Sequence, residues 1–488
     1  MAEGAKPRVA FPDARYFAVT WGIPDAYGGM TSVLLHRARA FYRLGGRAVE
    51  ILTFDARPDY REVESDLRER GELLPAMRLT NLWEWLREHD LPGDAPGSLR
   101  LEKHPFLPLE PGVGSERVAR DSSVFSRTRF ADDGATVLQV DYFRPDGTLL
   151  ASDLRDPTQP GSLGGRSVVL CDSAGEPARS WGSIWGLYRF WLDLLRGGSR
   201  SIMLVDSKTA ARFMLGYRRD DALAVHIVHG THLSDSEPGV IRKSRTAVFD
   251  NLAGFDSVVV LTRRQKTDIE SQLGRVPNLT VIPNSAEPDS EPASAPVRDE
   301  GRGVVIASLS ELKRVDHAVR ATLSAARDSA RPLSLDIFGE GSQRDSLDEL
   351  LRLHDAAGIV RMHGHRSDAR RHLAEASFLL LTSRSEAFAM VLLESMSAGC
   401  IPISYDISYG PADIISHGRN GFLVAPGDEV ALAEAILTLQ RMRPAQVARL
   451  RRNARRTAAQ YSDLAITKLW ARELRQSLRL KLAALAKR

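Results

Sequence analysis

Cysteine is nearly absent from this sequence. Only Cys171 and Cys400 occur in 488 residues, and they lie too far apart in the chain to form a disulfide framework or a metal-binding knuckle. A reducing compartment is therefore the expected environment, which favours a cytoplasmic protein.

Long apolar runs are also missing. No stretch reaches the roughly 18 apolar residues that a membrane-spanning helix needs, and residues 1–17 lack the apolar core of a signal peptide. We therefore expect a soluble protein, with contact at the inner face of a membrane as the open alternative. An excess of one charge is absent as well, since 66 basic residues face 62 acidic ones. Nucleic-acid binding is therefore not expected, whereas an anionic polymer or membrane patch stays open.

The length of the chain predicts two or three domains. Strand and helix patterns alternate in two stretches that are separated in the chain, and together these stretches predict one Rossmann-like domain. A later series of alternating strands and helices predicts a second such domain. A segment rich in Pro, Ser and Glu between the two series is typical of an interdomain linker. The predicted boundaries are residues 1–75 and 186–284 for the first domain, 285–303 for the linker and 304–460 for the second, with the first strand at residues 8–13.

Two further segments differ from these series. Residues 76–185 contain short runs that alternate apolar and polar residues, separated by turn pairs such as Asp146-Gly147 and Gly164-Gly165. This pattern predicts an antiparallel, β-rich insertion in the first domain. Residues 461–488 have a basic amphipathic pattern, which predicts a helix packed back on the protein, with an anionic membrane surface as the alternative.

The predicted fold class is therefore α/β. Two Rossmann-like, doubly wound parallel-sheet domains are expected to face a cleft, with the β-rich insertion in the first of them. In open α/β sheets, ligands bind at the carboxyl ends of the strands, so the candidate residues are sought there.

The segment 382–399 carries the strongest chemical signal in the sequence. A buried strand is predicted to end at Ser383, a short loop holds Glu386, and a helix is predicted to begin near Phe388. The first backbone N–H groups of that helix lack intrahelical acceptors, and the helix dipole favours an anion such as a diphosphate there. This contact is expected from Ala387, Phe388, Ala389, Met390 and Val391.

Glu394 lies about two turns into the same predicted helix. The four residues before it are apolar, so its carboxylate is expected to be buried and to need a partner. A ribose diol would satisfy Glu394, whereas Glu386, before the helix, could hold the hydroxyls of a sugar. The alternative makes Glu386 a helix-start residue and Glu394 a solvated helix position.

These residues stand in the pattern S-x-x-E-x-F-x-M-V-x-L-E-x-M-x-x-G, which resembles the retaining glycosyltransferases of family 4 and their GT-B fold. Further matches are spread along most of the chain. They are Gly28-Gly29-Met30, Pro283-Asn284, Phe338-Gly339-Glu340-Gly341, His363-Gly364-His365, and Gly410-Pro411 followed by Asn420-Gly421. Together they are highly specific, although a Gly-Gly pair alone is more often a simple turn.

The resemblance implies how a donor binds. Gly28 and Gly29 would bring backbone amides to the diphosphate of a UDP-sugar, and the turn at Gly339 would belong to the same site. The loop at His363 and Gly364 would meet the nucleobase through its backbone. No metal and no other cofactor is expected, because no Asp-x-Asp pair occurs in a plausible site.

One position departs from the family pattern. Members usually carry an arginine and, five residues later, a lysine after the first strand of the second domain. This sequence keeps Lys313 but has Ser308 at the position of the arginine. Charge builds up on the leaving diphosphate, so a missing cation is expected to slow the reaction unless Arg314 or Arg384 replaces it.

Three histidines, His226, His229 and His232, close a predicted buried strand. No acidic or cysteine cluster joins them, so a metal site is not expected. The resemblance places one of them near the donor sugar and favours His229. Asp206, at the end of another predicted strand, belongs either to the acceptor side or to a helix cap.

The β-rich insertion narrows the resemblance to enzymes that glycosylate wall teichoic acids, and it is also similar to glycosyltransferases that modify serine-rich adhesins. In those relatives the insertion serves acceptor binding or formation of a homo-oligomer. The resemblance implies α-retaining transfer of glucose or N-acetylglucosamine from a UDP-sugar to a hydroxyl of a polyol-phosphate polymer, with catalytic roles for Lys313, Glu386 and His229.

Two alternatives stay open at this point. One is O-glycosylation of Ser/Thr-rich proteins, and the other is a non-catalytic subunit that binds a protein acceptor. The expected mechanism is attack on the same face of the sugar from which the diphosphate leaves. No convincing carboxylate nucleophile is present for the two-step route that retaining glycosidases use.

Overall fold

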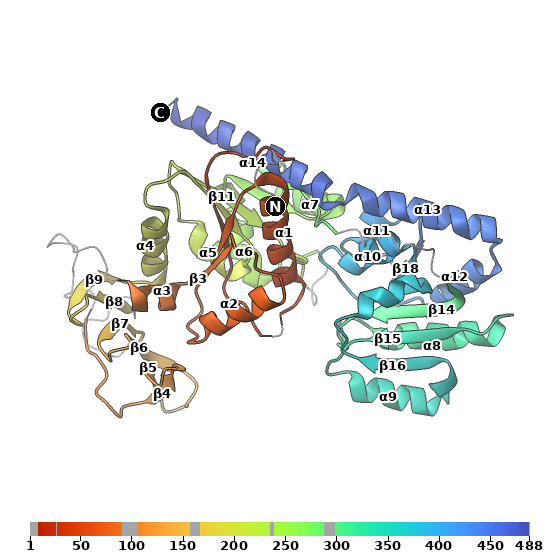
Figure 1. Ribbon diagram of the computed structural model, residues 1–488, viewed down its shortest axis with the longest axis horizontal. Helices are drawn as coiled ribbons and strands as arrows, with labels where there is room; N and C mark the ends of the chain where they lie inside the picture. Colours follow the sequence, from red (N-terminus) through yellow and green to blue (C-terminus); the bar gives the residue numbers. More distant parts are fainter. Residues whose placement is uncertain are drawn as a thin grey trace.

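The computed structural model describes residues 8–25, 27–89, 105–156, 166–234, 239–286 and 298–487. Two parallel sheets form two lobes, a third, antiparallel sheet extends from the first lobe, and a long C-terminal helix runs along one side of the molecule (Figure 1). This arrangement confirms the predicted α/β fold class, with two Rossmann-like halves and a β-rich insertion in the first.

The first lobe is built on a parallel sheet with the strand order β13-β12-β11-β10-β1-β2-β3. The strand order changes direction between β1 and β10, which is the kind of switch point where open α/β sheets bind ligands. The strands are β1 (Arg15–Val19), β2 (Val49–Thr53), β3 (Arg78–Asn81), β10 (Ser201–Val205), β11 (Ala222–Ile227), β12 (Ser257–Val260) and β13 (Leu279–Val281). The helices are α1 (Gly29–Gly45), α2 (Tyr60–Glu69), α3 (Leu82–Glu88), α4 (Ile184–Arg196), α5 (Lys208–Met214), α6 (Lys243–Phe249) and α7 (Arg263–Leu273).

The second lobe has a parallel sheet with the order β16-β15-β14-β17-β18-β19 and its switch point between β14 and β17. All residues of β17 and β18 are buried, as expected for apolar strands covered by helices on both faces. The strands are β14 (Asp299–Ile306), β15 (Ser334–Phe338), β16 (Val360–Gly364), β17 (Ala376–Leu381), β18 (Ile401–Tyr405) and β19 (Phe422–Val424). The helices are α8 (Val315–Asp328), α9 (Arg344–Leu353), α10 (Met390–Ala398), α11 (Pro411–Ile414), α12 (Glu429–Arg441) and α13 (Pro444–Gln460).

The insertion is an antiparallel meander whose strands pair in chain order. They are β4 (Ser115–Val118), β5 (Val124–Phe130), β6 (Val137–Phe143), β7 (Leu149–Leu154), β8 (Ser167–Cys171) and β9 (Pro177–Trp181). The Trp83 ring of α3 stacks on Tyr142 of β6 with centroids 3.6 Å apart, and both belong to the core of the first lobe. The insertion is therefore fixed to that lobe through a shared core.

The turn pairs of the insertion have different outcomes. The predicted Asp146-Gly147 turn joins β6 to β7, and Gly147 has a φ of 85°, which favours glycine. The predicted Gly164-Gly165 turn lies outside the described residues. The insertion also begins later than residue 76, because β3 pairs with β2 in the first sheet.

Two other boundaries were wrong. The first strand is β1 and not residues 8–13, where Val9 and Phe11 are buried at the end of α1 rather than in a sheet. β14 begins at Asp299, inside the predicted linker, whose residues 287–297 lie outside the described part of the chain. A Cβ on Gly301 would lie 2.0 Å from the carbonyl oxygen of Pro332, so close packing explains this glycine better than flexibility does.

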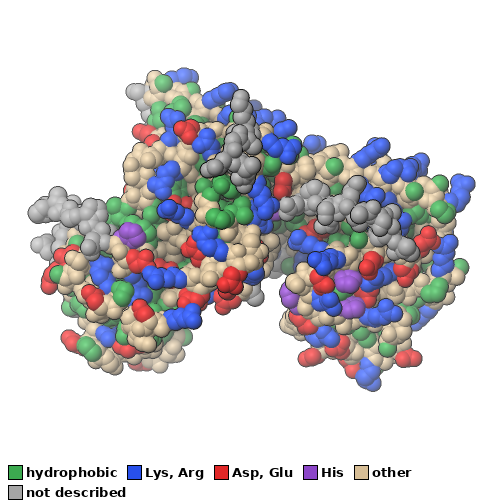
Figure 2. Space-filling model, in the orientation of Figure 1, with side chains coloured by type: hydrophobic (Ala, Val, Ile, Leu, Met, Phe, Trp, Pro, Cys, Tyr) green, Lys and Arg blue, Asp and Glu red, His purple; other side chains and the backbone are tan. Residues whose placement is uncertain are grey.

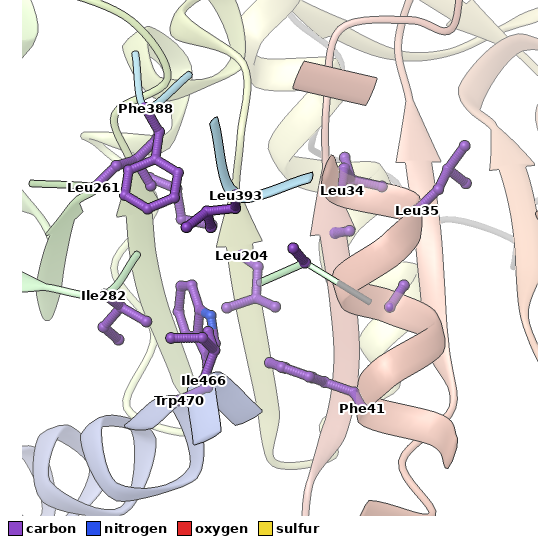
Figure 3. Close-up of a cluster of buried hydrophobic side chains, with 14 of the residues drawn as sticks. Leu34, Leu35, Phe41, Leu204, Leu261, Ile282, Phe388, Leu393, Ile466 and Trp470 are labelled. Atoms are coloured by element: carbon purple, nitrogen blue, oxygen red, sulfur yellow. The ribbon is translucent and has the colours of Figure 1, made fainter. Parts of the chain in front are cut away.

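Helix α14 (Asp463–Leu485) lies against α1. Its Trp470 side chain lies with Phe41 of α1 in a buried cluster that Phe388 and Leu393 of the second lobe also reach (Figure 3). The ring centroids of Phe41 and Trp470 are 6.0 Å apart. The apolar side of α14 therefore joins the two lobes. None of the helices in the described ranges has the length and apolar character to cross a membrane.

Candidate functional site

The loop between β17 and α10 holds Glu386 in an ion pair. Its carboxylate accepts hydrogen bonds from Lys313 Nζ at 2.5 Å and from Ser383 Oγ at 2.7 Å. The side chains of Lys313 and Glu386 are 22% and 15% exposed, so the pair is partly shielded but reaches solvent. Two residues that the sequence placed 73 positions apart thus meet at the carboxyl end of the second sheet.

The backbone of Glu386 is fixed from the other side. Its N–H donates to the carbonyl oxygen of Ser408 at 3.3 Å, and its carbonyl oxygen accepts from the N–H of Tyr409 at 2.9 Å. The Tyr409 ring is fully buried and lies nearly parallel to the His232 ring of the first lobe, with centroids 5.9 Å apart. Tyr409 therefore connects the Glu386 loop with the loop that follows β11.

Helix α10 begins later than predicted. Its first residue is Met390, and Ala389 stands before it in the left-handed region with φ 59°. Phe388 is not helical, and its side chain is buried in the core that α14 closes (Figure 3). Of the five predicted N–H donors, Met390 and Val391 open the helix and have no acceptor within it. Ala387, Phe388 and Ala389 precede the helix, so this part of the prediction was wrong.

Glu394 is a half-buried helix residue, less enclosed than its apolar neighbours predict. Its side chain is 13% exposed and lies 2.9 Å from a guanidinium nitrogen of Arg370. Arg370 belongs to the short 3₁₀ helix Ala369–Ala374 and is 64% exposed. An ion pair with so exposed a partner contributes little stability.

The loop after β14 places Lys313 and Ser308. The carbonyl oxygen of Lys313 accepts from Thr382 Oγ1 at 3.0 Å, which ties this loop to the end of β17. The N–H of Arg384 donates to the carbonyl oxygen of Leu312 at 2.7 Å, so Arg384 also belongs to this part of the site. Ser308 is exposed, and Arg314 lies beside Gly427 at the start of α12.

The turn with Gly339 passes directly over that loop. A Cβ on Gly339 would lie 1.8 Å from the carbonyl oxygen of Ala307, and the residue has a φ of 153°. The N–H of Leu309 donates to the carbonyl oxygen of Glu340 at 2.9 Å. Gly339 therefore permits a close backbone approach on one side of Ser308.

The side chain of His363 is held by protein contacts. Its Nε2 lies 2.6 Å from Asp336 Oδ1, and its ring stacks on Phe338 with centroids 4.6 Å apart. Burial would raise the pKa of Asp336, but hydrogen bonds from His363 and Arg302 lower it instead. The position of the His363 ring is thus fixed by contacts within the protein. The carbonyl oxygen of Gly364 accepts a hydrogen bond from the N–H of Gly339 at 2.9 Å.

In the first lobe, Asp206 and His229 face each other at the carboxyl ends of β10 and β11. His229 Nε2 lies 2.7 Å from Asp206 Oδ1. Arg37 of α1 donates to both oxygens of the same carboxylate at 3.0 and 2.7 Å. Burial alone would raise the pKa of Asp206, but the Arg37 guanidinium and the His229 ring hold it at about 2. Asp206 is therefore ionised, and its carboxylate fixes the orientation of the His229 ring.

Arg37 was missed by the sequence analysis. It lies on the buried face of α1, beside Leu34 and Phe41, and its side chain is 8% exposed. A lone arginine among apolar residues at helical spacing was the available signal, because a buried guanidinium needs a carboxylate partner.

The other two histidines do not converge with His229. His226 is buried, with Nδ1 3.0 Å from the carbonyl oxygen of Val205, and burial lowers its pKa to about 4. His232 lies between the rings of Phe249 and Tyr409. Within the part of the chain that the structure describes, no group of three His, Cys, Asp or Glu side chains has an arrangement that could hold a metal ion.

Gly28 and Gly29 open helix α1, which has no side-chain cap and no acidic residue in its first turn. A Cβ on either glycine would meet no atom within 4 Å. Packing therefore does not require glycine at these positions, and the space in front of them suits a ligand that approaches the backbone. The space-filling view shows a wide indentation between the two lobes (Figure 2).

Comparison with known proteins agrees with this geometry. Residues 290–457 match the family model described as glycosyl transferases group 1. The poly(ribitol-phosphate) alpha-N-acetylglucosaminyltransferase of Staphylococcus aureus is 22% identical over 457 residues, which cover 84% of this chain and 90% of that protein. A Streptomyces coelicolor protein, the exopolysaccharide phosphotransferase SCO2592, is 39% identical over 191 residues. That stretch covers 38% of this chain and only 20% of that protein.

A solved structure extends the comparison to nearly the whole chain. A mutant of S. aureus TarM, in complex with fondaparinux, alpha-GlcNAc-glycerol and UDP, matches with a TM-score of 0.69 and 20% identity over 94% of this chain and 99% of that chain. This likeness shows the GT-B fold. The resemblance to teichoic acid glycosyltransferases that the motifs predicted is therefore confirmed.

Proposed function

We propose that this chain, a glycosyltransferase by the match of residues 290–457, moves glucose or N-acetylglucosamine from a UDP-sugar to a hydroxyl of a polyol-phosphate polymer, with retention of the α configuration. The observation that carries the proposal is the ion pair between Lys313 and Glu386 at the start of α10. It places a cation and a hydroxyl-binding carboxylate together where a helix N-terminus favours a diphosphate.

The donor binds by exchanging partners within this site. The diphosphate takes the ammonium group of Lys313 and backbone N–H groups from Ala387 to Val391, of which those of Met390 and Val391 open α10. Glu386 then accepts hydrogen bonds from the hydroxyls of the sugar, and Glu394 releases Arg370 to bind the ribose diol. The backbone at His363 and Gly364 meets the nucleobase, while the amides of Gly28 and Gly29 approach the diphosphate from the first lobe.

The first lobe supplies the acceptor side. Asp206 occupies Nε2 of His229, which leaves the opposite ring nitrogen, Nδ1, to contact the sugar. The acceptor oxygen attacks the anomeric carbon from the face that the diphosphate leaves. One C–O bond to the β-phosphate breaks, one C–O bond to the acceptor forms, and the proton of the acceptor hydroxyl passes to the leaving phosphate oxygen.

A covalent intermediate on Glu386 is disfavoured. Retaining glycosidases use a free carboxylate as nucleophile, whereas both hydrogen bonds to Glu386 use Oε1 to fix it beside a lysine. Charge on the departing diphosphate is stabilised by Lys313 and the N-terminus of α10. The proposal therefore assigns no step to a metal ion or cofactor, and transfer should continue in the presence of a strong chelator.

The experiment that tests the proposal compares acceptors. Wild-type protein is incubated with UDP-glucose or UDP-N-acetylglucosamine and either a polyol-phosphate polymer or a Ser/Thr-rich peptide, and UDP release and product mass are measured. The proposal predicts sugar on the polymer. Transfer to the peptide alone would support the protein O-glycosyltransferase alternative, and no UDP release with either acceptor would support a non-catalytic subunit.

A further inference from the structure

A cavity of about 380 Å³ lies between the β-rich insertion and the first lobe, outside the site described above. Its wall combines side chains from the insertion, from α4 and α5, and from the loops that follow β1 and β2. The wall includes Trp21, Asp153, Arg155, Arg166, Trp185 and Arg212.

The charge of this cavity is positive. The side chain of Asp153 is 2% exposed. Its Oδ2 accepts hydrogen bonds from the guanidinium groups of Arg155 at 2.7 Å and Arg166 at 2.8 Å. One carboxylate balances only one of these two guanidinium groups, and Arg212 adds another cation to the same wall. Arg155 and Arg166 are 37% and 29% exposed, so both can reach a ligand. Guanidinium groups bind phosphate through paired N–H donors.

Two of the aromatic side chains that line the same cavity are exposed to solvent. Trp21 and Trp185 are 38% and 37% exposed, although large aromatic side chains are usually covered. The Arg212 guanidinium carbon lies 5.8 Å from the centre of the Trp185 ring. Exposed indole faces beside cations suit a ligand with C–H faces and negative charge, such as a chain of polyols joined by phosphodiesters.

The cavity lies on the same edge of the first sheet as His229. Trp21 follows β1, and Thr209 in the cavity wall comes three residues after Asp206. From β2, which Phe54 follows, to β11, which leads to His229, there are three strand spacings, or about 14 Å. A single repeat at His229 would therefore leave the cavity empty, whereas a chain can occupy both places.

We propose that this cavity is a second subsite for the acceptor polymer, which binds a repeat upstream of the one that receives the sugar. One phosphodiester lies between Arg212 and the Arg155–Arg166 pair, and the adjoining polyol carbons lie on Trp21 and Trp185. The inference rests on the proposed function for the identity of the polymer. With this subsite, the insertion and the first lobe together would bind a polymer chain in preference to a single repeat.

The test compares a polyol-phosphate polymer with a single glycerol-phosphate repeat as acceptors for the full-length protein. Trp185→Ala and Arg212→Ala change exposed side chains, so the fold should survive. The readout is the ratio of kcat/KM for the polymer to kcat/KM for the single repeat. Each variant is expected to lower this ratio by about tenfold through a higher KM for the polymer, and Trp185→Phe should restore most of it.

Matched controls separate a subsite from general damage. Phe130→Ala removes an aromatic side chain of the insertion that is also 38% exposed, and Arg352→Ala removes an exposed cation of the second lobe. Both should leave the ratio at the wild-type value. An unchanged ratio in Trp185→Ala and Arg212→Ala would overturn the inference, as would an equal loss in the controls.

A second measurement keeps this inference separate from the proposed function. Polymer binding is measured directly by calorimetry, without donor. If the wild type transfers no sugar but binds polymer about tenfold more tightly than Arg212→Ala does, the subsite stands and the proposed activity fails. If it transfers sugar while Arg212→Ala binds polymer as the wild type does, the subsite fails and the activity stands. Preferential binding of an acidic peptide by the wild type would also overturn the inference.

Discussion

Lys313 and Glu386 form an ion pair with 2.5 Å between Nζ and Oε1, and Glu386 lies in the loop between β17 and α10. Neither residue is fully buried, so both side chains remain accessible to a ligand. In the proposed donor site, this pair holds the lysine and the carboxylate in place before a diphosphate binds. The site is thus arranged in advance, which is how enzymes stabilise developing charge at low reorganisation cost.

Removing the lysine charge should abolish most transfer. Lys313→Met keeps the length of the side chain but leaves the departing diphosphate without its ammonium partner. We expect kcat to fall by about 10² to 10³, while the melting temperature changes little because the residue is at the surface of the site. Steady-state UDP release measures this effect, and a kcat within a factor of two of wild type would contradict it.

The serine at position 308 offers a gain-of-function test. Ser308→Arg supplies the cation that the resemblance to family 4 glycosyltransferases leads us to expect there, at a position that is exposed. We expect kcat to rise by about tenfold, since each added donor to the diphosphate stabilises the same developing charge. Ser308→Gln, which is long but uncharged, is the control. An equal rise in both variants would show that charge is not the reason.

The Asp206 carboxylate should make stability depend on pH. Its pKa in the folded protein is about 2, below the value of 3.8 for a free aspartate. A lowered pKa means that the carboxylate stabilises the fold above pH 4, and that this contribution disappears as the pH falls through about 2. The shift corresponds to about 2 kcal/mol of unfolding free energy.

Asp206→Asn checks this contribution. The substitution leaves Arg37 buried without its ionic partner, which should cost about 3 kcal/mol at pH 7. Urea unfolding of the variant and the wild type from pH 7 to pH 2 should show a difference that shrinks below pH 4. A difference that stays constant with pH would mean that the charge of Asp206 does not matter.

Gly339→Ala should destabilise the second lobe and displace the loop with Ser308. The added Cβ would lie 1.8 Å from the carbonyl oxygen of Ala307 at a φ of 153°, a strain of about 1 to 3 kcal/mol. Gly358→Ala is the control, because a Cβ there meets no atom within 4 Å. Thermal unfolding should separate the two variants, and equal melting temperatures would argue against the close approach.

Much of the fold could be predicted from periodic patterns. Helix α1 buries Leu34, Leu35, Ala38 and Phe41, whose spacing in the sequence is that of an amphipathic helix. The apolar run before Ser383 predicted a buried strand, and β17 is buried throughout. Such patterns indicate which side chains are buried. They therefore predict an element correctly where burial repeats with the period of a helix or a strand.

Contacts between distant segments were harder to predict. Val9 and Phe11 alternate like a strand, yet they are buried against the end of α1. Arg37 lies alone in an apolar stripe, which indicates that it needs a carboxylate but not that Asp206 supplies it. No local pattern pairs Arg370 with Glu394. The start of α10 was predicted two residues early because Ala389 adopts a left-handed conformation that its sequence does not indicate.

The most direct test of the donor site is UDP release from a UDP-sugar in the presence of a polyol-phosphate polymer, measured for the wild type and for Glu386→Gln. This substitution keeps the shape of the side chain but removes the carboxylate that pairs with Lys313 and receives the sugar hydroxyls. The account predicts polymer-dependent release by the wild type and a loss of about a hundredfold in the variant, with Arg352→Ala unchanged. Equal release by Glu386→Gln and the wild type would contradict it.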